Sequence, residues 1–443
     1  MEDITMRKIF QYIMLAVVTI VMASCTSDIE ETTATTGKSN VQLVVGEFPA
    51  FGDSQTRAIG TPDPGKTSWA EGDELLLEMT SKTLGTKYAA FTYNGSSWEL
   101  ASGELSYKED EVPTFPHVYY APNYKWESGK LTLKEGKVAG TDEYIEGKAN
   151  ITPNGQGINV SFANATRNYS RLRIATMPNK QITVDINQYT PAGSTRYNID
   201  NYNNYYTLTS DEKGNAYLYG TFHETSSHVL VKYKEAPLAT YQFSKETENA
   251  KSYALDATVV SLTDEGITYD QIVEDVKKEL DAGKTYINLI LAPDVDEETL
   301  EAIHIGLLEG DARDGSINLT LIGCKKIPSR GFLHFDMLKS IVLPDVTEIG
   351  EKAFSNCAWL EKVVLGNLTK VYGNVGKKGI FDGCRTKDID LVLPKNQEVM
   401  KSEFYENSNQ YIWKPTGESY FAGPNKDNGI FLGYQFMSVK KWE

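Results

Sequence analysis

The feature that most constrains the fold is an apolar pattern that recurs between residues 317 and 394. In its clearest copy, a short apolar run at residues 341–343 is followed by a proline, a turn and a central phenylalanine, and the pattern then restarts. The phenylalanine recurs at positions 332, 354 and 381, at steps of 22 (354 − 332) and 27 (381 − 354) residues. A fixed period in the low twenties predicts stacked units, because one unit cannot bury its apolar face alone.

The string LPDVTEIGEKAFSNCAWLEKVVL at residues 343–365 resembles the leucine-rich repeat of the BspA type, which occurs in surface proteins of oral and gut anaerobes. Degenerate copies flank it, so the resemblance covers residues 317–394. It implies a short solenoid that presents an extended binding surface. The expected repeat core consists of Leu343, Ile349, Phe354, Cys357, Leu360, Leu365, Phe381 and Cys384.

Two of these core residues, Cys357 and Cys384, fall at equivalent points of neighbouring units. Stacked strands lie about 4.8 Å apart, which is within the range that a disulfide tolerates, so a bond between the two residues stays open. Phe335 holds the same place one unit earlier. A place that accepts either Phe or Cys is an apolar core position, and we therefore expect free, buried thiols.

The first 24 residues have the pattern of a signal peptide. Arg7 and Lys8 precede an uncharged apolar run at residues 12–22, which is too short to span a bilayer comfortably. The sequence Met-Ala-Ser before Cys25 resembles the lipobox of bacterial lipoproteins, which implies lipidation (palmitate) of Cys25. The alternative is a plain secretory signal with a chance cysteine. Residues 25–40 are rich in Thr, Ser and Glu, and we expect a flexible linker. Their acidic start resembles the surface-export signal of outer-membrane lipoproteins.

The next 220 or so residues are predicted to form two β-domains, at residues 41–150 and 151–261. The chain contains 26 Tyr and 35 Gly, which favour strands and turns. Apolar residues alternate at 41–48, and Asn94-Gly95 predicts a tight hairpin turn. Six strand candidates separated by turn residues then predict a second sandwich, which begins with the strand at residues 158–162.

The first of these regions resembles the N-terminal domain of the fimbrillin family (Mfa/Fim-like). The resemblance is carried by the order of Thr56-Arg57-Ala58, Trp69-x-x-Gly72-Asp73, a tyrosine-rich hairpin and Tyr119-Tyr120-Ala121-Pro122 after the lipobox. It implies transthyretin-like β-sandwiches, cleavage between Arg57 and Ala58, and removal of the strand that contains Val41, Leu43 and Val45. A strand from the next subunit would then fill the groove. The alternative is that Arg57 is an ordinary loop arginine.

The C-terminal region, residues 262–443, opens with helical signals. Thr268 with Gln271 forms a capping-box pattern before a helix that extends to residue 282. A second helix is expected at residues 297–308, with Asp294 or Asp296 as its cap. A strand-helix-strand unit therefore precedes the repeats and covers one end of their core, and residues 429–442 are expected to close the other end.

Several kinds of chemistry find no candidate in the sequence. The net charge of −16 argues against a nucleic-acid or anionic-membrane surface. His223 and His228 are not at a metal-ligand spacing. The acidic run at residues 294–298 could attract calcium, but an acidic helix N-terminus explains it better. Aromatic residues at 197–206 could stack on sugars, although a turn-rich loop is the simpler interpretation. We expect no catalytic activity, cofactor or metal.

Together these predictions describe a mainly β protein with two tandem β-sandwiches and a short α/β leucine-rich-repeat solenoid. The first hypothesis is a lipid-anchored adhesin of the outer-membrane surface, an accessory or tip subunit of a fimbrium assembled by donor-strand exchange. Its partners would be other fimbrial subunits and a host protein or glycan, and a lipid anchor would be its membrane contact. The alternative is a stand-alone surface lipoprotein that binds host protein or glycan without strand exchange.

Overall fold

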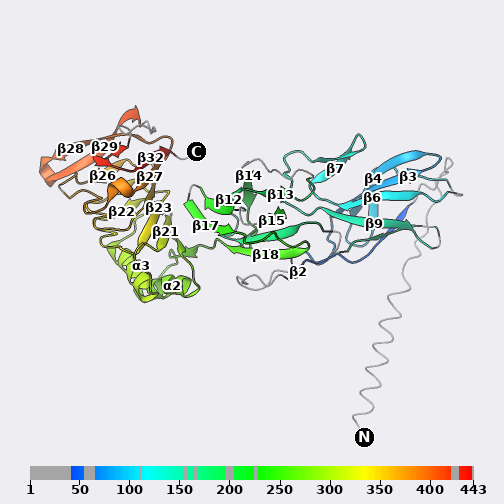
Figure 1. The fold of residues 1–443 in the computed structure, drawn as a ribbon, viewed down its shortest axis with the longest axis horizontal. Coiled ribbons are helices and arrows are strands. Elements are labelled where there is room, and N and C mark those ends of the chain that lie inside the picture. The colour runs from blue at the N-terminus through cyan, green and yellow to red at the C-terminus, as the bar shows by residue number, and fades with distance from the viewer. Residues whose placement is uncertain are drawn as a thin grey trace, which may run out of the picture.

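A computed structural model describes residues 41–53, 65–108, 111–153, 155, 157–163, 167–194, 204–223, 228–234, 236–376, 378–420 and 429–441. The described chain is mainly β-structure, as predicted, and forms three bodies in a row (Figure 1). The first body holds most of the blue and cyan strands, the second the green strands, and the third the yellow to red strands. A search of the described residues finds no helix of the length and apolarity needed to cross a membrane.

The first body is a seven-stranded sheet in the order β1-β10-β9-β6-β3-β4-β5. Its strands are β1 (Gln42–Val45), β3 (Glu74–Ser81), β4 (Gly85–Tyr93), β5 (Trp98–Gly103), β6 (Thr114–Tyr120), β9 (Ile145–Ile151) and β10 (Gly157–Ser161). The end strands β1 and β5 contact each other, so the sheet curls around one apolar core. A small hairpin, β7 (Tyr124–Glu127) and β8 (Lys130–Leu133), packs outside it. The predicted hairpin at Asn94-Gly95 is confirmed as the β4–β5 connection.

The second body has two sheets around a shared core, in the orders β13-β15-β11-β18-β2 and β14-β12-β16-β17. Its strands are β2 (Gly52–Asp53), β11 (Ser170–Ala175), β12 (Gln181–Ile186), β13 (Tyr189–Pro191), β14 (Asn204–Thr209), β15 (Asn215–Phe222), β16 (His228–Tyr233), β17 (Ala236–Gln242) and β18 (Lys251–Asp256). Strand β2 comes from the N-terminal end of the chain and pairs in parallel with β18.

These pairings correct the predicted boundary between the two β-regions at residue 150. Strand β10, assigned from the sequence to the second sandwich, pairs with β9 and β1 in the first sheet. Strand β2, assigned to the first, lies in the second body. Alternation of apolar residues shows that a strand exists, but the sheet it joins depends on distant partners.

The third body alternates between two sheets. The first sheet, in the order β19-β20-β21-β23-β25-β27-β32, is parallel throughout its described pairs. It contains β19 (Val260–Ser261), β20 (Tyr286–Ile290), β21 (Ile317–Ile322), β23 (Leu338–Leu343), β25 (Lys362–Leu365), β27 (Asp390–Leu393) and β32 (Ser438–Lys441). The second sheet contains β22 (Lys326–Ile327), β24 (Glu348–Ile349), β26 (Lys370–Tyr372), β29 (Gln410–Ser419) and β28 (Glu398–Tyr405), in that order. A short hairpin, β30 (Ile430–Phe431) with β31 (Tyr434–Gln435), precedes β32, and the single turns η2 (Thr386–Asp388) and η3 (Glu406–Ser408) join strands.

The 22-residue step is visible in the register of both sheets. Ile341 pairs with Val363 in the first sheet, and Glu348 pairs with Lys370 in the second. The central phenylalanines stack inside the body, with ring centroids 5.4 Å apart for Phe332 and Phe354 and 5.2 Å apart for Phe354 and Phe381. The repeat that the sequence predicts is therefore also a spatial repeat.

Two helices of the described chain, α2 (Tyr269–Asp281) and α3 (Glu297–Glu309), cover the start of the third body (Figure 1). The capping box of Thr268 and Gln271 is present as predicted. Of the two cap candidates for α3, Asp296 accepts from the Thr299 backbone, at 2.8 Å. Both helices bury an apolar side against the core, so this end of the core is covered.

The second body is fixed to the outer face of the first parallel sheet. Ala236 packs against Val342 and Val364, and the Asn288 side chain donates to the Leu238 carbonyl, at 2.8 Å. Lys234 forms an ion pair with Asp345. Strand β17 and the turn before it therefore occupy part of the outer face of the parallel sheet, and this part is not open to a ligand.

Candidate functional site at the N-terminal segment

Residues 41–53, here called the N-terminal segment, cross from the first body to the second. Their first part is β1, which contains two of the predicted removable residues, Leu43 and Val45; Val41 comes just before it. Leu43 is buried in the first core, Val41 and Val45 pack beside it, and Val44 is exposed. The predicted strand is thus confirmed, with alternate side chains pointing into the core. Cys25, Arg57 and Ala58 lie outside the described residues.

Strand β1 occupies one end of its sheet. Among the described strands it pairs with β10 alone, in parallel, from Gln42 opposite Gly157 to Val45 opposite Val160. The Trp69 indole adds a hydrogen bond to the Gly46 carbonyl, at 2.7 Å. An end strand can leave a sheet without breaking any other strand pair, and β1 holds such a place.

After β1, Phe48 anchors the segment to an aromatic cluster of the first body. Its buried ring meets Trp69 edge-on at 4.9 Å and Tyr120 edge-on at 5.5 Å. The Tyr120 hydroxyl donates to Asp73, at 3.1 Å, and Lys66 bridges the same two groups. Burial raises the pKa of Tyr120 far above its usual value, so the phenol stays protonated and remains a donor. Trp69 of the predicted Trp-x-x-Gly-Asp motif thus packs against Phe48, and Asp73 of the motif accepts from Tyr120 beside it.

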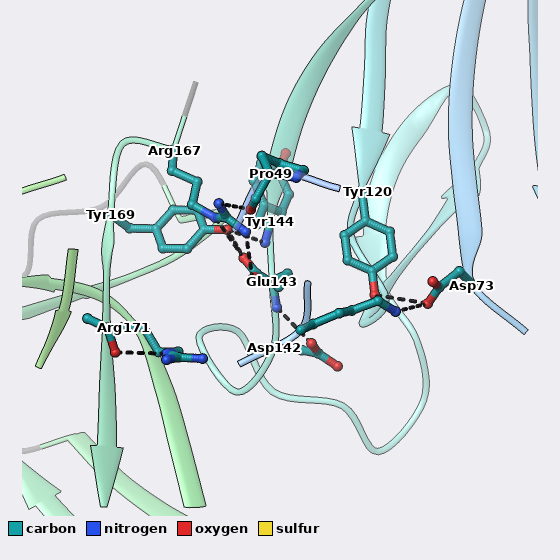
Figure 2. A network of polar contacts seen from close by, with 11 residues as sticks. Pro49, Asp73, Tyr120, Asp142, Glu143, Tyr144, Arg167, Tyr169 and Arg171 are labelled. Carbon is teal, nitrogen blue, oxygen red and sulfur yellow. Dashed lines mark hydrogen bonds and ion pairs between the residues drawn. The ribbon is translucent and has the colours of Figure 1, made fainter. Parts of the chain in front are cut away.

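A buried ion pair lies where the segment leaves the first body (Figure 2). Arg167, which has no exposed surface, holds both oxygens of Glu143, with Nη2–Oε1 at 2.9 Å and Nε–Oε2 at 3.2 Å. The Tyr169 hydroxyl donates to Glu143 at 2.5 Å and accepts from the Tyr144 backbone N–H at 2.9 Å. Arg167 Nη1 donates to the carbonyl of Pro49. A carbonyl of the segment therefore completes the network.

Two residues further on, Phe51 is held by cations and aromatic rings. The centroid of its ring lies 4.0 Å from Arg167 Cζ and 4.9 Å from Arg171 Cζ, and Tyr169 and Tyr219 pack beside it. We call Arg167, Tyr169, Arg171 and Tyr219 the Phe51 cage. Phe51 is 8% exposed. Desolvated cation–π contacts of this kind are worth about 2 kcal/mol each.

The chain returns to the same place after the segment. Gly65 has φ +67°, and a side chain there would overlap the Arg171 guanidinium. Arg171 is almost fully buried and donates to Ser252, at 3.0 Å. The residues at both ends of the stretch 54–64, which contains Arg57, are therefore fixed at the second body.

Burial sets the electrostatics of this junction. It raises the pKa of Tyr169, and the carboxylate of Glu143 beside it raises that pKa further. Burial also raises the pKa of Asp142. A buried arginine that loses its partners is strongly unfavourable, so the segment's carbonyl and ring stabilise the charge that the junction contains.

The predicted repeat-core residues come together as one core in the third body. Leu343, Ile349, Phe354, Cys357, Leu360, Leu365 and Phe381 are buried, and Cys384 packs against them half-buried. The Cys357 thiol donates to the Phe332 carbonyl at 3.1 Å, and the Cys384 thiol donates to the Phe354 carbonyl at 2.8 Å. The cysteines are free in this structure, as expected. The hydrogen bond with the Cys384 side chain, together with burial, raises the pKa of Cys357 and keeps this thiol protonated.

The other candidate residues have ordinary partners. His223 contacts Thr190 and Glu246, and His228 contacts Thr240. Asp294 pairs with Lys326 at 3.2 Å. Within the described ranges, no group of three or more His, Cys, Asp or Glu side chains is placed to hold a metal. Of the aromatic stretch 197–206, the described part contains exposed Tyr205 and buried Tyr206.

Sequence reasoning missed Phe51, Glu143 and the cage. A usable signal was present, because Arg167, Tyr169 and Arg171 alternate and residues two apart in an extended chain share a face. Two arginines and a tyrosine at every second position, running from the residues before β11 into that strand, indicate a buried polar site. Their partners, however, are spread along the chain: Glu143 is 24 positions from Arg167, whereas Pro49 is 118 positions away.

Comparisons with known proteins give little guidance. No family model and no curated protein matches the chain. A search of solved structures finds a crystal structure from Bacteroides fragilis NCTC 9343 of a protein provisionally described as a cell adhesion protein. The match has 13% identity and a TM-score of 0.26, and covers 51% of this chain and 94% of that one. A likeness at this level carries no argument about function.

Proposed function

We propose that the protein is a lipid-anchored cell-surface adhesin and an accessory or tip subunit of a fimbrium assembled by donor-strand exchange. The observation that carries the proposal is the place of β1, a parallel strand at the end of the first sheet that is continuous with the residues before Arg57. Cleavage after Arg57, with Ala58 as the new start, would separate the N-terminal segment from the body that it completes. The lipid on Cys25 would leave with it.

Loss of the segment would empty three neighbouring sites. The groove beside β10 would lose Leu43, the Trp69–Tyr120 cluster would lose Phe48, and the cage would lose Phe51. A strand from another subunit that refills them would gain ladder hydrogen bonds and apolar contacts, as in other forms of strand addition. Other fimbrial subunits are therefore the proposed partners.

We further propose that the third body is a leucine-rich-repeat solenoid of the BspA type that presents the ligand-binding surface. The parallel register, the 22-residue step and the stacked phenylalanines support this assignment. Strand β32 pairs with β27 in the chain's own sheet. Because β32 is already part of this chain's own sheet, we infer a subunit that accepts a strand from a neighbour and does not donate β32 to one. The proposal includes no catalytic activity, cofactor or metal.

The second candidate is a stand-alone surface lipoprotein that binds host protein or glycan with its segment in place. The cage favours it, because Pro49 and Phe51 complete a buried ionic network whose disruption is strongly unfavourable. In this function the segment is a permanent clasp between the first two bodies.

The two functions differ in whether the segment can be exchanged. A variant with a specific protease site in place of residues 55–58 would be cut and mixed with a fluorescent peptide of residues 41–53. Strand exchange predicts that the peptide replaces the cut segment, and that the cut protein without peptide unfolds at lower urea. The stand-alone function predicts that the segment stays bound and no peptide enters. A peptide with Leu43→Asp is the matched control.

A further inference from the structure

A groove of about 470 Å³ crosses the second sheet of the third body. Its lining includes Lys326, Glu348 and Tyr372 from three successive parallel strands, and Gln410 from β29. None of its lining residues belongs to the joint with β17. Ligand clefts usually measure about 300–1,000 Å³, so the groove has the size of a site for a small extended molecule.

The charges along this groove alternate in sign. Of the charged lining residues, Asp294 pairs with Lys326 at 3.2 Å, and the parallel register places Lys326 beside Glu348. Lys370, which lies outside the lining, is beside Glu348 on the next strand. The electrostatic potentials of opposite charges on adjacent strands largely cancel at a distance, so the groove attracts neither an anion nor a cation strongly. A neutral ligand with many donors and acceptors fits such a lining best.

The main chain of the groove is already in use. Strand β24 lies between β22 and β26, and the Gly350 N–H donates to the Ile327 carbonyl, at 2.9 Å. Addition of a peptide strand requires an unpaired sheet edge. Strand β22 is an end strand of this sheet, but residues 293–294 lie along it, since the Lys326 N–H donates to the Pro293 carbonyl at 3.1 Å and Asp294 forms a β-bridge with Lys326. Recognition in the groove must therefore use side chains.

The side chains offer hydrogen-bonding groups beside an aromatic ring. Glu348 supplies a carboxylate, Gln410 an amide and Ser329 a hydroxyl, and the half-buried Tyr372 lies on the same lining. The hairpin next to it presents Phe404, which is 48% exposed and packs against Tyr411 in a tilted arrangement, with ring centroids 5.0 Å apart. Rigid aromatic rings add contact area at low entropic cost.

We propose that this groove binds a neutral oligosaccharide. Glu348, Gln410 and Ser329 bind its hydroxyls. The Lys370 ammonium lies over one face of the Tyr372 ring, 4.6 Å from its centroid, and the opposite face packs against the C–H face of one sugar ring. The inference rests on the proposed function in that it gives the adhesin a ligand class, while the groove itself does not depend on strand exchange.

The test mixes the full chain with neutral di- to tetrasaccharides of glucose, mannose, galactose and N-acetylglucosamine. Binding is detected by saturation-transfer NMR, and its affinity is measured by calorimetry. We expect one or more of these series to bind. Tyr372→Ala and Gln410→Ala should each weaken that binding about tenfold or more, whereas Tyr372→Phe should retain most of it. Trp359→Ala is the matched control, since Trp359 is an exposed aromatic residue of the same body outside the groove.

Three results would overturn the proposal: no neutral oligosaccharide binds, sulfated or sialylated glycans or peptides bind instead, or Trp359→Ala weakens binding while folded Tyr372→Ala does not. An unchanged thermal unfolding profile shows that a variant is folded. Failure of strand exchange can be distinguished from failure of sugar binding, because strand exchange is measured separately with the peptide of residues 41–53. A chain that binds sugar but keeps its segment is the stand-alone adhesin, and one that exchanges strands without binding sugar contradicts the groove assignment alone.

Discussion

At the scale of single residues, the junction between the first two bodies depends on one ring and one ion pair. Phe51 lies against the two guanidinium groups of its cage, and the segment's Pro49 carbonyl accepts from Arg167. Both contacts join parts of the chain more than 100 residues apart. Side chains here therefore control how firmly the N-terminal segment is held.

The first prediction concerns Phe51. Phe51→Ala removes a buried ring, and truncation of a buried Phe usually lowers the free energy of unfolding by about 3–5 kcal/mol. Urea unfolding followed by near-UV circular dichroism measures this loss. Phe404→Ala, at an exposed ring, should change stability by about 0.5 kcal/mol or less. Equal losses in the two variants would show that the cage does not hold the segment.

The second prediction concerns the ion pair. Arg167→Met leaves the Glu143 carboxylate buried without its main partner, and we expect a loss of about 3–5 kcal/mol. The double variant Arg167→Met, Glu143→Leu should recover part of that loss, because the unpaired charge is gone. Removing the exposed pair Lys245–Glu248 serves as control, with about 0–1 kcal/mol expected. A double variant no more stable than Arg167→Met would contradict this account of the junction.

At the scale of elements, β1 and the stacked units of the third body show what local sequence can predict. The 22-residue period predicts the parallel register, and the Thr268 capping box predicts the start of α2, because both depend on neighbouring residues. The assignment of β10 was wrong, and β2 was missed as part of the second body. Strand pairing across 200 residues, as in Gly52 beside Lys251, leaves no local pattern.

The third prediction tests the stacked units. Phe354 has no exposed surface and lies between Phe332 and Phe381. Phe354→Ala should therefore destabilise the third body by about 3–5 kcal/mol, measured as a shift of its own unfolding transition. Trp359→Ala, five residues away and half exposed, should leave that transition nearly unchanged. A large shift in the control with none in Phe354→Ala would contradict the central stack.

At the scale of the whole molecule, the three bodies form one extended arrangement in which each joint is specific (Figure 1). The segment and its cage join the first two bodies, and β17 joins the second body to the parallel sheet. Occupation of that sheet face moves the expected ligand surface to the second sheet. Sequence alone predicted the stacked units and the existence of strand β1. The joints arise from contacts between distant residues and could not be predicted from local patterns.

The most direct test of strand exchange is the N-terminal sequence of the mature protein taken from the cell surface. Strand exchange predicts a start at Ala58, with Cys25 and the N-terminal segment gone and the segment's sites filled by another subunit. A lipidated start at Cys25, with residues 41–53 retained, would contradict strand exchange. The protein would then be a permanently anchored adhesin, whose Phe51 cage is a fixed clasp.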